Sequence, residues 1–345
     1  MDMKKIEDES DFKYLFMALW RERILILSIT LIASLLAGLF SILILTPVYD
    51  SKLDIIINMP ENYKTKYGDY ALPITTNQQY INLITSNYVL LNTISDMGSD
   101  ADGVTIEKLR DSITVSEVGL VTSAVGIEQN SFVVKVSSNN PEKAKIFAET
   151  LYSNYNEFLN VMLTEVAVEY YYNDYLVQIE ALEDTLTTNK ELLKKNEELI
   201  SKTKQTINQK EAMNEIGTKD LVVLENIINP NYTELENDII SIKQNISMTE
   251  TSIKQYITYV EDLANKKVDI ENYYKTGDYK ETISNMFINS NSYIYLSSKP
   301  IAPTRKTSPS NAKNVIIGAI AGGIISVMIA LIKEYWFKKE EISKQ

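Results

Sequence analysis

Two long uncharged apolar segments lie near the ends of the chain. Residues 24–45 read ILILSITLIASLLAGLFSILIL, and residues 315–332 read VIIGAIAGGIISVMIALI. A helix crosses a hydrocarbon core of about 30 Å with about 20 apolar residues, so both segments are long enough to span a membrane. The pattern therefore predicts two transmembrane helices with most of the chain between them.

Each apolar segment has an alternative interpretation. Residues 24–45 could be a signal peptide, but their apolar run is longer than the h-region of such peptides, and no small-x-small cleavage site follows before Thr46. Residues 315–332 could be a buried core helix, but basic residues bracket them on both sides. Membrane spans are the favoured interpretation of both segments.

Basic residues near the first span indicate its orientation. Lys13, Arg21 and Arg23 precede the span, whereas only Lys52 lies soon after it. Because the cytosolic flanks of membrane spans are enriched in Lys and Arg, we expect the N-terminus in the cytosol. A second span then returns the C-terminus to the same side.

The segment between the spans carries the whole excess of negative charge. Residues 1–23 and 333–345 are expected as cytosolic tails, so that residues 46–314 lie outside. The chain has 34 Lys+Arg and 46 Asp+Glu, a net charge of −12, and the outer segment alone holds 25 basic and 37 acidic residues. Nucleic-acid binding needs a surplus of Lys and Arg, so nucleic acid is not an expected partner.

The composition excludes much of enzyme chemistry. The sequence contains no histidine and no cysteine, so disulfides, thiol nucleophiles, Cys/His zinc sites and histidine-based triads cannot form. It contains no Walker A loop either. No catalytic residue, cofactor or metal ligand is predicted. Asp96, Asp100 and Asp102 could bind calcium, but their run lacks the glutamate of an EF-hand loop, which favours a polar turn.

Strands and helices alternate in residues 46–140, which predicts a compact α/β base next to the membrane. Residues 48–58 end in a β-branched run typical of a strand, and two further strand-like runs lie in residues 111–138. Residues 77–97 have helical apolar spacing, with Asn77 as the expected N-cap. The predicted fold class is therefore an α+β membrane protein.

A change of period at Asn140 and Pro141 predicts a long helical hairpin over residues 141–273. Asn at the N-cap and Pro in the first turn are start signals for a helix, and no other Pro or Gly occurs up to Glu211. Residues 231–273 then form a second helix with heptad spacing. Its expected seam consists of Ile239, Ile246, Ile253 and Val260. Two ordinary helices of a globular bundle are the alternative.

Residues 274–314 are expected to return the chain to the second span through a strand over residues 293–298. The prolines that follow keep this approach extended and deny it helical hydrogen bonds. They are Pro300, Pro303 and Pro309. Inside the span, Gly318 and Gly322 form a GxxxG step, and Gly323 extends its small face. Small residues at that spacing let helix backbones approach closely in lipid.

Three consecutive tyrosines, at 170–172, lie near the base of the predicted long helix in a chain with 22 tyrosines. Aromatic rings offer flat apolar faces on which sugars can stack. Packing of these rings against the α/β base or a neighbouring subunit is the favoured interpretation.

This organisation resembles the polysaccharide co-polymerase family, the Wzz-type chain-length determinants. The resemblance covers the architecture of the whole chain and is sharpest in three segments: DFKYLFMALWRERILIL into the first span, TPVYDSKLDIII after it, and PIAPTRKTSP before the second. The start of the long helix, NNPEKAKIFAETLYSNYNEF, also follows the family's pattern. Residues 305–307 depart from that pattern, because some relatives have another proline there.

The resemblance implies a protein without catalytic chemistry. Family members assemble as rings in the bacterial plasma membrane. They set the modal length of a polysaccharide (O-antigen, capsule or exopolysaccharide) that a Wzy-type polymerase builds from lipid-linked repeats. The expected partners are thus the bilayer, further copies of the chain, the polymerase and the lipid-linked glycan, with a separate cytosolic tyrosine kinase left open. The alternative function is an adaptor of such a kinase or a coiled-coil bridge in polysaccharide export.

Overall fold

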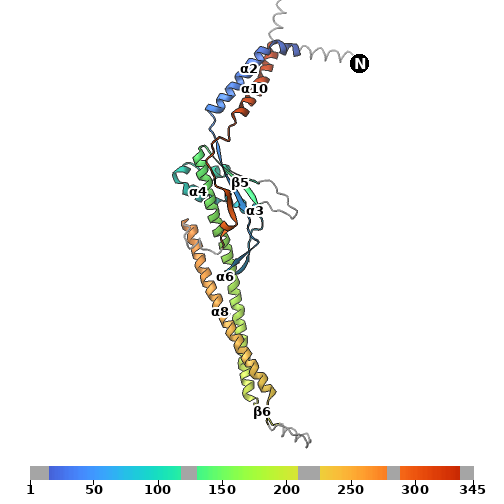
Figure 1. The fold of residues 1–345 in the computed structure, drawn as a ribbon, viewed down its shortest axis with the longest axis vertical. Coiled ribbons are helices and arrows are strands. Elements are labelled where there is room, and N and C mark those ends of the chain that lie inside the picture. Colours follow the sequence, from blue (N-terminus) through green and yellow to red (C-terminus); the bar gives the residue numbers. More distant parts are fainter. Residues whose placement is uncertain (1–14, 118–129, 209–225, 278–287, 335–345) are drawn as a thin grey trace, which may run out of the picture. The chain divides into compact units, whose positions relative to one another are not determined.

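The computed structural model describes residues 15–117, 130–208, 226–277 and 288–334 (Figure 1). These residues form two compact units. The first, here the sheet unit, contains the described residues up to Asn58, Thr76–Tyr155 and those from Ile294 onward. The second, here the hairpin unit, contains Met59–Thr75 and the described part of Asn156–Tyr293.

Two apolar helices of spanning length belong to the sheet unit. They are α2 (Arg23–Leu43) and α10 (Asn311–Ile332), with mean hydropathies of 2.4 and 2.7. Figure 1 shows them side by side. α10 begins before the predicted residue 315, because the Ser310 hydroxyl accepts a bond from the Lys313 amide and caps a polar first turn. The prediction of two apolar helices of membrane-spanning length is confirmed.

The sheet has four antiparallel strands in the order β4-β5-β1-β8. Their bounds are β1 Tyr49–Ile57, β4 Ile113–Glu117, β5 Ser131–Ser138 and β8 Ile294–Ser298. Along β1, Leu53, Ile55 and Ile57 are fully buried, while the alternate residues point to the opposite face. The sequence predicts all four strands, whereas residues 118–129 between β4 and β5 lie outside the described part.

Short helices complete the sheet unit. They are α3 Asn77–Asn82, η1 Leu83–Thr85, α4 Asn87–Met97, η2 Gly98–Ala101 and α5 Ile106–Asp111. The single helix predicted over residues 77–97 is wrong, because Ser86 has an extended backbone that separates η1 from α4. Asn77 is also not the cap: Thr76 caps α3 in a reciprocal capping box with Gln79.

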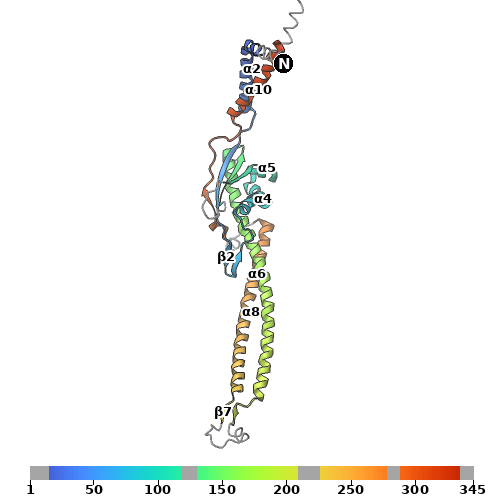
Figure 2. The ribbon, with the colours of Figure 1, turned by 90° about the vertical axis from the view of Figure 1, so that its right-hand side faces the viewer.

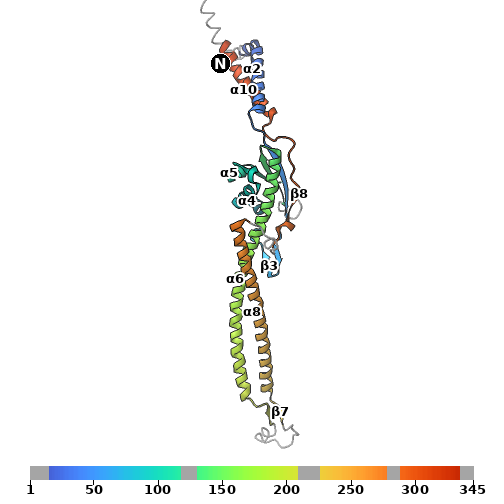
Figure 3. The ribbon, with the colours of Figure 1, turned by 90° about the vertical axis from the view of Figure 1, so that its left-hand side faces the viewer.

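The hairpin unit is built on α6 (Pro141–Lys202) and α8 (Pro230–Thr276). The first turns of α6, up to Tyr155, belong to the sheet unit. Figures 2 and 3 show the two helices side by side. Asn140 and Asn229 cap them, as expected of Asn before Pro. With 62 residues, α6 is about 93 Å long at 1.5 Å per residue.

The first helix of the hairpin ends earlier than predicted, whereas the second extends slightly beyond the predicted residues 231–273 at both ends. α6 stops at Lys202 rather than near residue 211, because the chain turns into β6 (Thr206–Ile207), which pairs with β7 (Ile227–Ile228). The Asn229 side chain also donates to the Lys204 carbonyl oxygen at 2.7 Å, which ties the two helix ends together. Residues 209–225, which connect β6 to β7 along the chain, lie outside the described residues.

A second, unpredicted β-hairpin belongs to the same unit. β2 (Asn62–Thr65) pairs with β3 (Gly68–Ala71), and the turn between them consists of Lys66 and Tyr67. Contacts with α6 and α8 place residues 59–75 in the hairpin unit, whereas the sequence assigned residues 46–140 to one base. η3 (Ser290–Ser292) completes the unit.

Candidate functional sites: the span interface and the helical hairpin

The GxxxG face of α10 packs on α2 of the same chain. A Cβ added at Gly318 would collide with the Cβ of Ala37, and one added at Gly322 would lie 2.5 Å from the Cβ of Ala33. At Gly323 the nearest atom would be 3.9 Å away, so this glycine lies beside the contact. The glycine face is thus occupied within the chain, and contacts between copies would have to use other faces of the spans.

Polar side chains join the two spans along their length. The hydroxyl oxygens of Thr30 and Ser326 lie 3.4 Å apart in the middle of the interface. Near the sheet, the Ser41 hydroxyl donates to the Asn311 side chain at 3.0 Å and accepts from Asn314 at 2.8 Å. The Thr30 and Ser326 hydroxyls each donate to a carbonyl of their own helix. The bonds of Ser41 to α10 therefore select the register of the helix pair.

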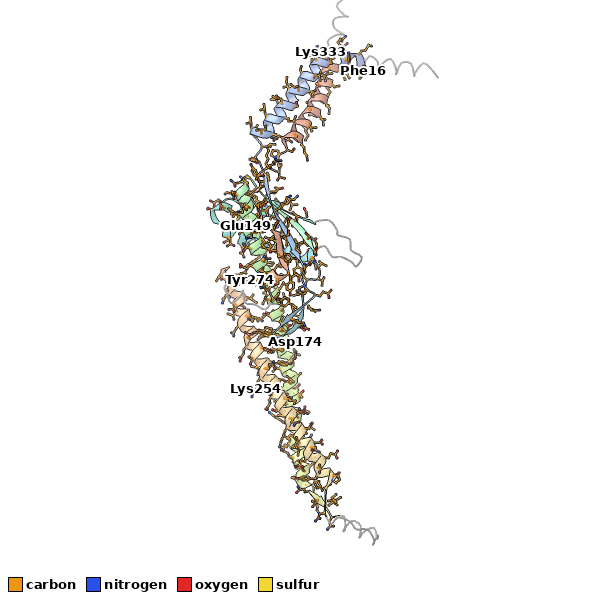
Figure 4. All side chains as sticks on the ribbon, viewed as in Figure 1. Phe16, Glu149, Asp174, Lys254, Tyr274 and Lys333 are labelled. Atoms are coloured by element: carbon orange, nitrogen blue, oxygen red, sulfur yellow. The ribbon has the colours of Figure 1, made fainter. Side chains whose placement is uncertain are left out.

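Ion pairs hold the other end of the helix pair. Lys333, labelled in Figure 4, lies 2.9 Å from Glu22, and Arg21 pairs with Glu334. The two pairs connect residues just before α2 with residues just after α10. Both ends of the described chain are therefore fixed on one side of the span pair, which agrees with the predicted two-pass arrangement.

The proline segment runs beside the start of β1. The Val48 amide donates to the Ser308 carbonyl at 2.8 Å, the Thr307 amide donates to the Val48 carbonyl at 2.8 Å, and the Ser51 hydroxyl donates to the Ile301 carbonyl at 3.1 Å. Among the three predicted prolines, Pro300 is buried and the other two, Pro303 and Pro309, are half-buried. The segment thus connects the exit of one span to the entry of the other. The functional role of the prolines stays a prediction.

The predicted heptad seam of α8 faces inward. Ile253 is 8% exposed, and Ile239, Ile246 and Val260 are half-buried. Thr249 is buried as well, one helical turn before Ile253, at a seam position that its polar side chain concealed in the sequence. Counting heptads without regard to polarity would have found it.

Three ion pairs connect α6 and α8. They join Lys190 to Glu250 at 3.1 Å, Lys243 to Glu197 at 3.0 Å and Lys267 to Glu169 at 2.7 Å. All six side chains are substantially exposed, so each pair contributes little stability on its own. The ion pairs instead fix the register of the two antiparallel helices, because each pair can form in only one alignment of α6 with α8. Tyr274, labelled in Figure 4, adds a bond to Glu165 at 2.7 Å.

A tyrosine cluster connects the β2–β3 hairpin to both long helices. Tyr67 and Tyr70 of the β-hairpin pack on Tyr171 of α6, at centroid distances of 5.5 and 5.9 Å. Tyr175 of α6 packs on Tyr259 of α8 at 5.3 Å. Of the three consecutive tyrosines, the middle one is thus buried by packing within the unit, in line with the favoured interpretation, although the partner is this β-hairpin.

Asp262 of α8 anchors the turn of the β-hairpin. Its carboxylate accepts hydrogen bonds from Lys66 (2.5 Å) and from the Tyr67 hydroxyl. Desolvation opposes its ionisation, but these two bonds outweigh it and hold the pKa of Asp262 below its ordinary value. The pKa of Tyr67 is raised instead. Burial is the largest cause, and the hydrogen bond to Asp262 is the next. The sequence gives no local signal for this contact, because Tyr67 and Asp262 are 195 positions apart.

The tyrosine cluster predicts a loss of stability at alkaline pH. Burial, followed by coulombic interaction with neighbouring tyrosines, raises the pKa of Tyr175 from 10.0 to about 12. A group whose pKa is higher in the folded than in the unfolded protein stabilises the fold at any pH below its unfolded pKa. This contribution is lost as the pH rises through its folded pKa. We therefore expect the melting temperature to fall as the pH rises from about 10 to about 12, because tyrosines of the unfolded chain ionise first.

The alkaline effect is measured by thermal unfolding of the full chain in detergent. Tyr175→Phe should reduce the alkaline loss, because it removes one ionisable group and keeps the ring. Tyr295→Phe, at a position that is 43% exposed, is the matched control and should leave the loss unchanged. An equal alkaline loss in both variants would show that the cluster does not cause it.

The aspartates considered for calcium have other partners. Asp96 accepts a hydrogen bond from the Asn154 side chain at 2.8 Å, and Asp100 lies 3.6 Å from the ammonium group of Lys143. Across the described ranges, no group of three or more Asp or Glu side chains is arranged to hold a metal ion. The run around Gly98 therefore serves as a turn that is tied to α6.

The geometry defines a class of membrane protein in which two packed apolar helices flank an α/β sheet and a helical hairpin. Residues 8–97 match the family model of the Wzz chain length determinant protein. The match takes in α2, β1 and α4, and with them two of the three segments that carry the resemblance. The resemblance to the Wzz-type family is therefore confirmed for this region, whereas the proline segment lies outside the matched residues.

A curated relative also matches part of the chain. It is the "Probable capsular polysaccharide biosynthesis protein YwqC" of Bacillus subtilis (strain 168), 30% identical over 158 residues. These residues cover 44% of this chain and 57% of the relative. The match thus spans little more than half of the relative's length.

Solved structures of low sequence identity resemble the chain. A full-length bacterial polysaccharide co-polymerase is 15% identical, with 93% of this chain and 98% of that chain covered and a TM-score of 0.46. The wild-type Shigella flexneri lipopolysaccharide O-antigen chain-length regulator WzzBSF is 15% identical, with 74% and 99% covered and a TM-score of 0.27. At these scores the likenesses add no weight to the family match.

Proposed function

We propose that this protein regulates the chain length of a bacterial polysaccharide without catalysing its synthesis. The observation that carries the proposal is the match of residues 8–97 to the chain length determinant family. The capsular relative supports a role in surface polysaccharide, because its matched region belongs to a protein named for capsular biosynthesis. O-antigen, capsule and exopolysaccharide are all compatible with the fold.

The composition supports a non-enzymatic role. The sequence has no histidine and no cysteine, which removes the commonest general base and the commonest thiol nucleophile. What the chain offers instead is a rigid rod: two long helices aligned by ion pairs, with a tyrosine cluster that fixes a β-hairpin to them. Such a rod can hold a growing chain or a polymerase at a defined position, and this is a task that does not require chemistry.

The proposed mechanism places several copies of the chain around a Wzy-type polymerase and its lipid-linked glycan. Both termini lie in the cytosol, because Lys13, Arg21 and Arg23 precede the first span. The sheet and the hairpin are then extracytoplasmic. Copies associate through surfaces other than the GxxxG face, which α2 occupies.

A truncation of the C-terminal tail separates this function from that of a kinase adaptor. A chain-length regulator should keep the preferred polysaccharide length when residues 338–345 are deleted, because the spans and the outer segment remain. An adaptor of a cytosolic tyrosine kinase would lose its function, because it depends on the tail. The measurement is a gel of surface polysaccharide from cells with either chain, and a changed length distribution in the truncated strain would favour the adaptor.

A further inference from the structure

The uncovered face of the sheet unit contains an open cavity of about 660 Å³. Its floor is formed by β1 and β5, and its wall by the segment between β8 and α10. The charged side chains that line it are Asp50, Lys52, Asp54, Lys135, Lys299 and Arg305. We call this site the basic cavity.

Two lysines lie directly opposite each other on the floor of the basic cavity. Lys52 of β1 and Lys135 of β5 are partners in the antiparallel register, and their neighbours Leu53 and Val134 point to the buried face. Like charges directly opposite each other destabilise a sheet. The sheet therefore carries an unfavourable pair at this place, which an anion between the two ammonium groups would turn into a favourable one.

The four cations of the basic cavity have no anionic partner. Within the described ranges, Lys52, Lys135, Lys299 and Arg305 form no ion pair with any carboxylate. They contrast with the lysines of the hairpin, which repeatedly meet a glutamate of the opposite helix. The chain as a whole has a net charge of −12, whereas this cavity gathers four such cations, so its local charge is opposite in sign.

The two carboxylates of the cavity are engaged by hydroxyl groups. Asp50 accepts a hydrogen bond from Ser137 at 2.9 Å, and Asp54 accepts one from Ser298 at 3.3 Å. Both carboxylates keep their negative charge, and neither forms an ion pair with the lysine between them on β1. With four cations and two carboxylates, the lining keeps a positive formal charge.

The chain places the basic cavity next to the membrane spans. α2 ends at Leu43 and β1 begins at Tyr49, while Thr307, at the edge of the cavity, precedes α10 at Asn311. Main-chain bonds between Val48 and the Thr307–Ser308 pair hold these two connections together. A ligand whose phosphate lies at the membrane surface is within reach of such a site.

We propose that the basic cavity binds a phosphate group, presented either by a lipid headgroup or by a free phosphate. Arg305 supplies a planar fork that matches phosphate oxygens, and the lysines supply point charges around it. A phosphate between Lys52 and Lys135 would remove their mutual repulsion. The proposal goes beyond chain-length regulation and does not rest on it, since binding can be measured without any polysaccharide.

Binding by the purified full chain tests the proposal. The soluble probe is inorganic phosphate, titrated by calorimetry onto the protein in a neutral detergent. The lipid probe is a nanodisc of phosphatidylcholine with or without phosphatidylglycerol, from which the lipids that remain bound are identified by native mass spectrometry. Lys52→Gln with Lys135→Gln is the test variant. Lys194→Gln with Lys254→Gln, two exposed lysines of the hairpin, is the control with the same change of charge.

We expect the test variant to bind at least about tenfold more weakly than the parent, as for the loss of two charge-assisted hydrogen bonds. The control should bind like the parent. Loss of inorganic phosphate binding alone identifies a free phosphate as the source, and loss of phosphatidylglycerol binding alone identifies a lipid headgroup. Parent protein that binds neither probe, or equal binding by parent and test variant, overturns the proposal. If the test variant fails to fold, Arg305→Gln replaces it, because Arg305 lies outside the strands.

Discussion

Replacing Ile253 by Asp is expected to unfold much of the helical hairpin. Ile253 is 8% exposed and lies on the inward seam of α8. The change removes a buried aliphatic side chain and introduces a carboxylate without a partner, so the free energy of unfolding should fall by about 4 kcal/mol or more. In a protein of marginal stability, that is a large fraction of the total.

The same substitution at an exposed isoleucine of α8 is the matched control. Ile240 is 51% exposed, so Ile240→Asp changes the charge and the helix propensity equally but buries nothing. The measurement is thermal unfolding of the full chain in detergent, followed by far-ultraviolet circular dichroism. Similar melting curves for the two variants would mean that the heptads form no seam, and they would favour two independent helices.

Replacing Gly322 by Ala is expected to separate the two spans. The added Cβ would lie 2.5 Å from the Cβ of Ala33, which is closer than real Cβ contacts, and 3.3 Å from the Cα of Thr30, which is a tight contact. The backbones of α2 and α10 must then move apart, with a loss of about 1–2 kcal/mol of packing. Gly323→Ala is the control, because its nearest neighbour would lie at 3.9 Å.

An engineered cross-link measures this separation. The chain has no cysteine, so Thr30→Cys with Ser326→Cys introduces a single pair at side chains whose oxygens lie 3.4 Å apart. We expect rapid disulfide formation within one chain, slower formation when Gly322→Ala is added, and no change with Gly323→Ala. Equal rates in all three proteins would show that the glycine step is not a packing face.

Much of the fold follows from local patterns in the sequence. The spans are predictable because uncharged apolar runs of that length are typical of membrane-crossing helices. The start of α6 is predictable because Asn140 and Pro141 act on the next turn of the chain itself. The inward face of α8 follows from its heptads, since Ile253 and its neighbours repeat every seven residues.

The remaining features depend on contacts between distant residues or on competing local signals. The apolar spacing of residues 77–97 predicts one helix, but Ser86 interrupts it. The first helix is capped by Thr76, through a capping box, and not by Asn77. The bond between Tyr67 and Asp262 joins residues 195 positions apart, so that no local pattern reveals it. The GxxxG step predicts close helix packing but does not name the partner, which is α2 of the same chain.

The measurement that tests chain-length regulation most directly is the size distribution of surface polysaccharide from a strain that lacks this protein. If the protein sets length without making bonds, the polymer keeps its sugars and linkages, and its preferred length band collapses into a broad, mostly short distribution. Complementation with the parent chain should restore the band. Complete loss of polymer, or an unchanged length distribution, would contradict regulation of chain length.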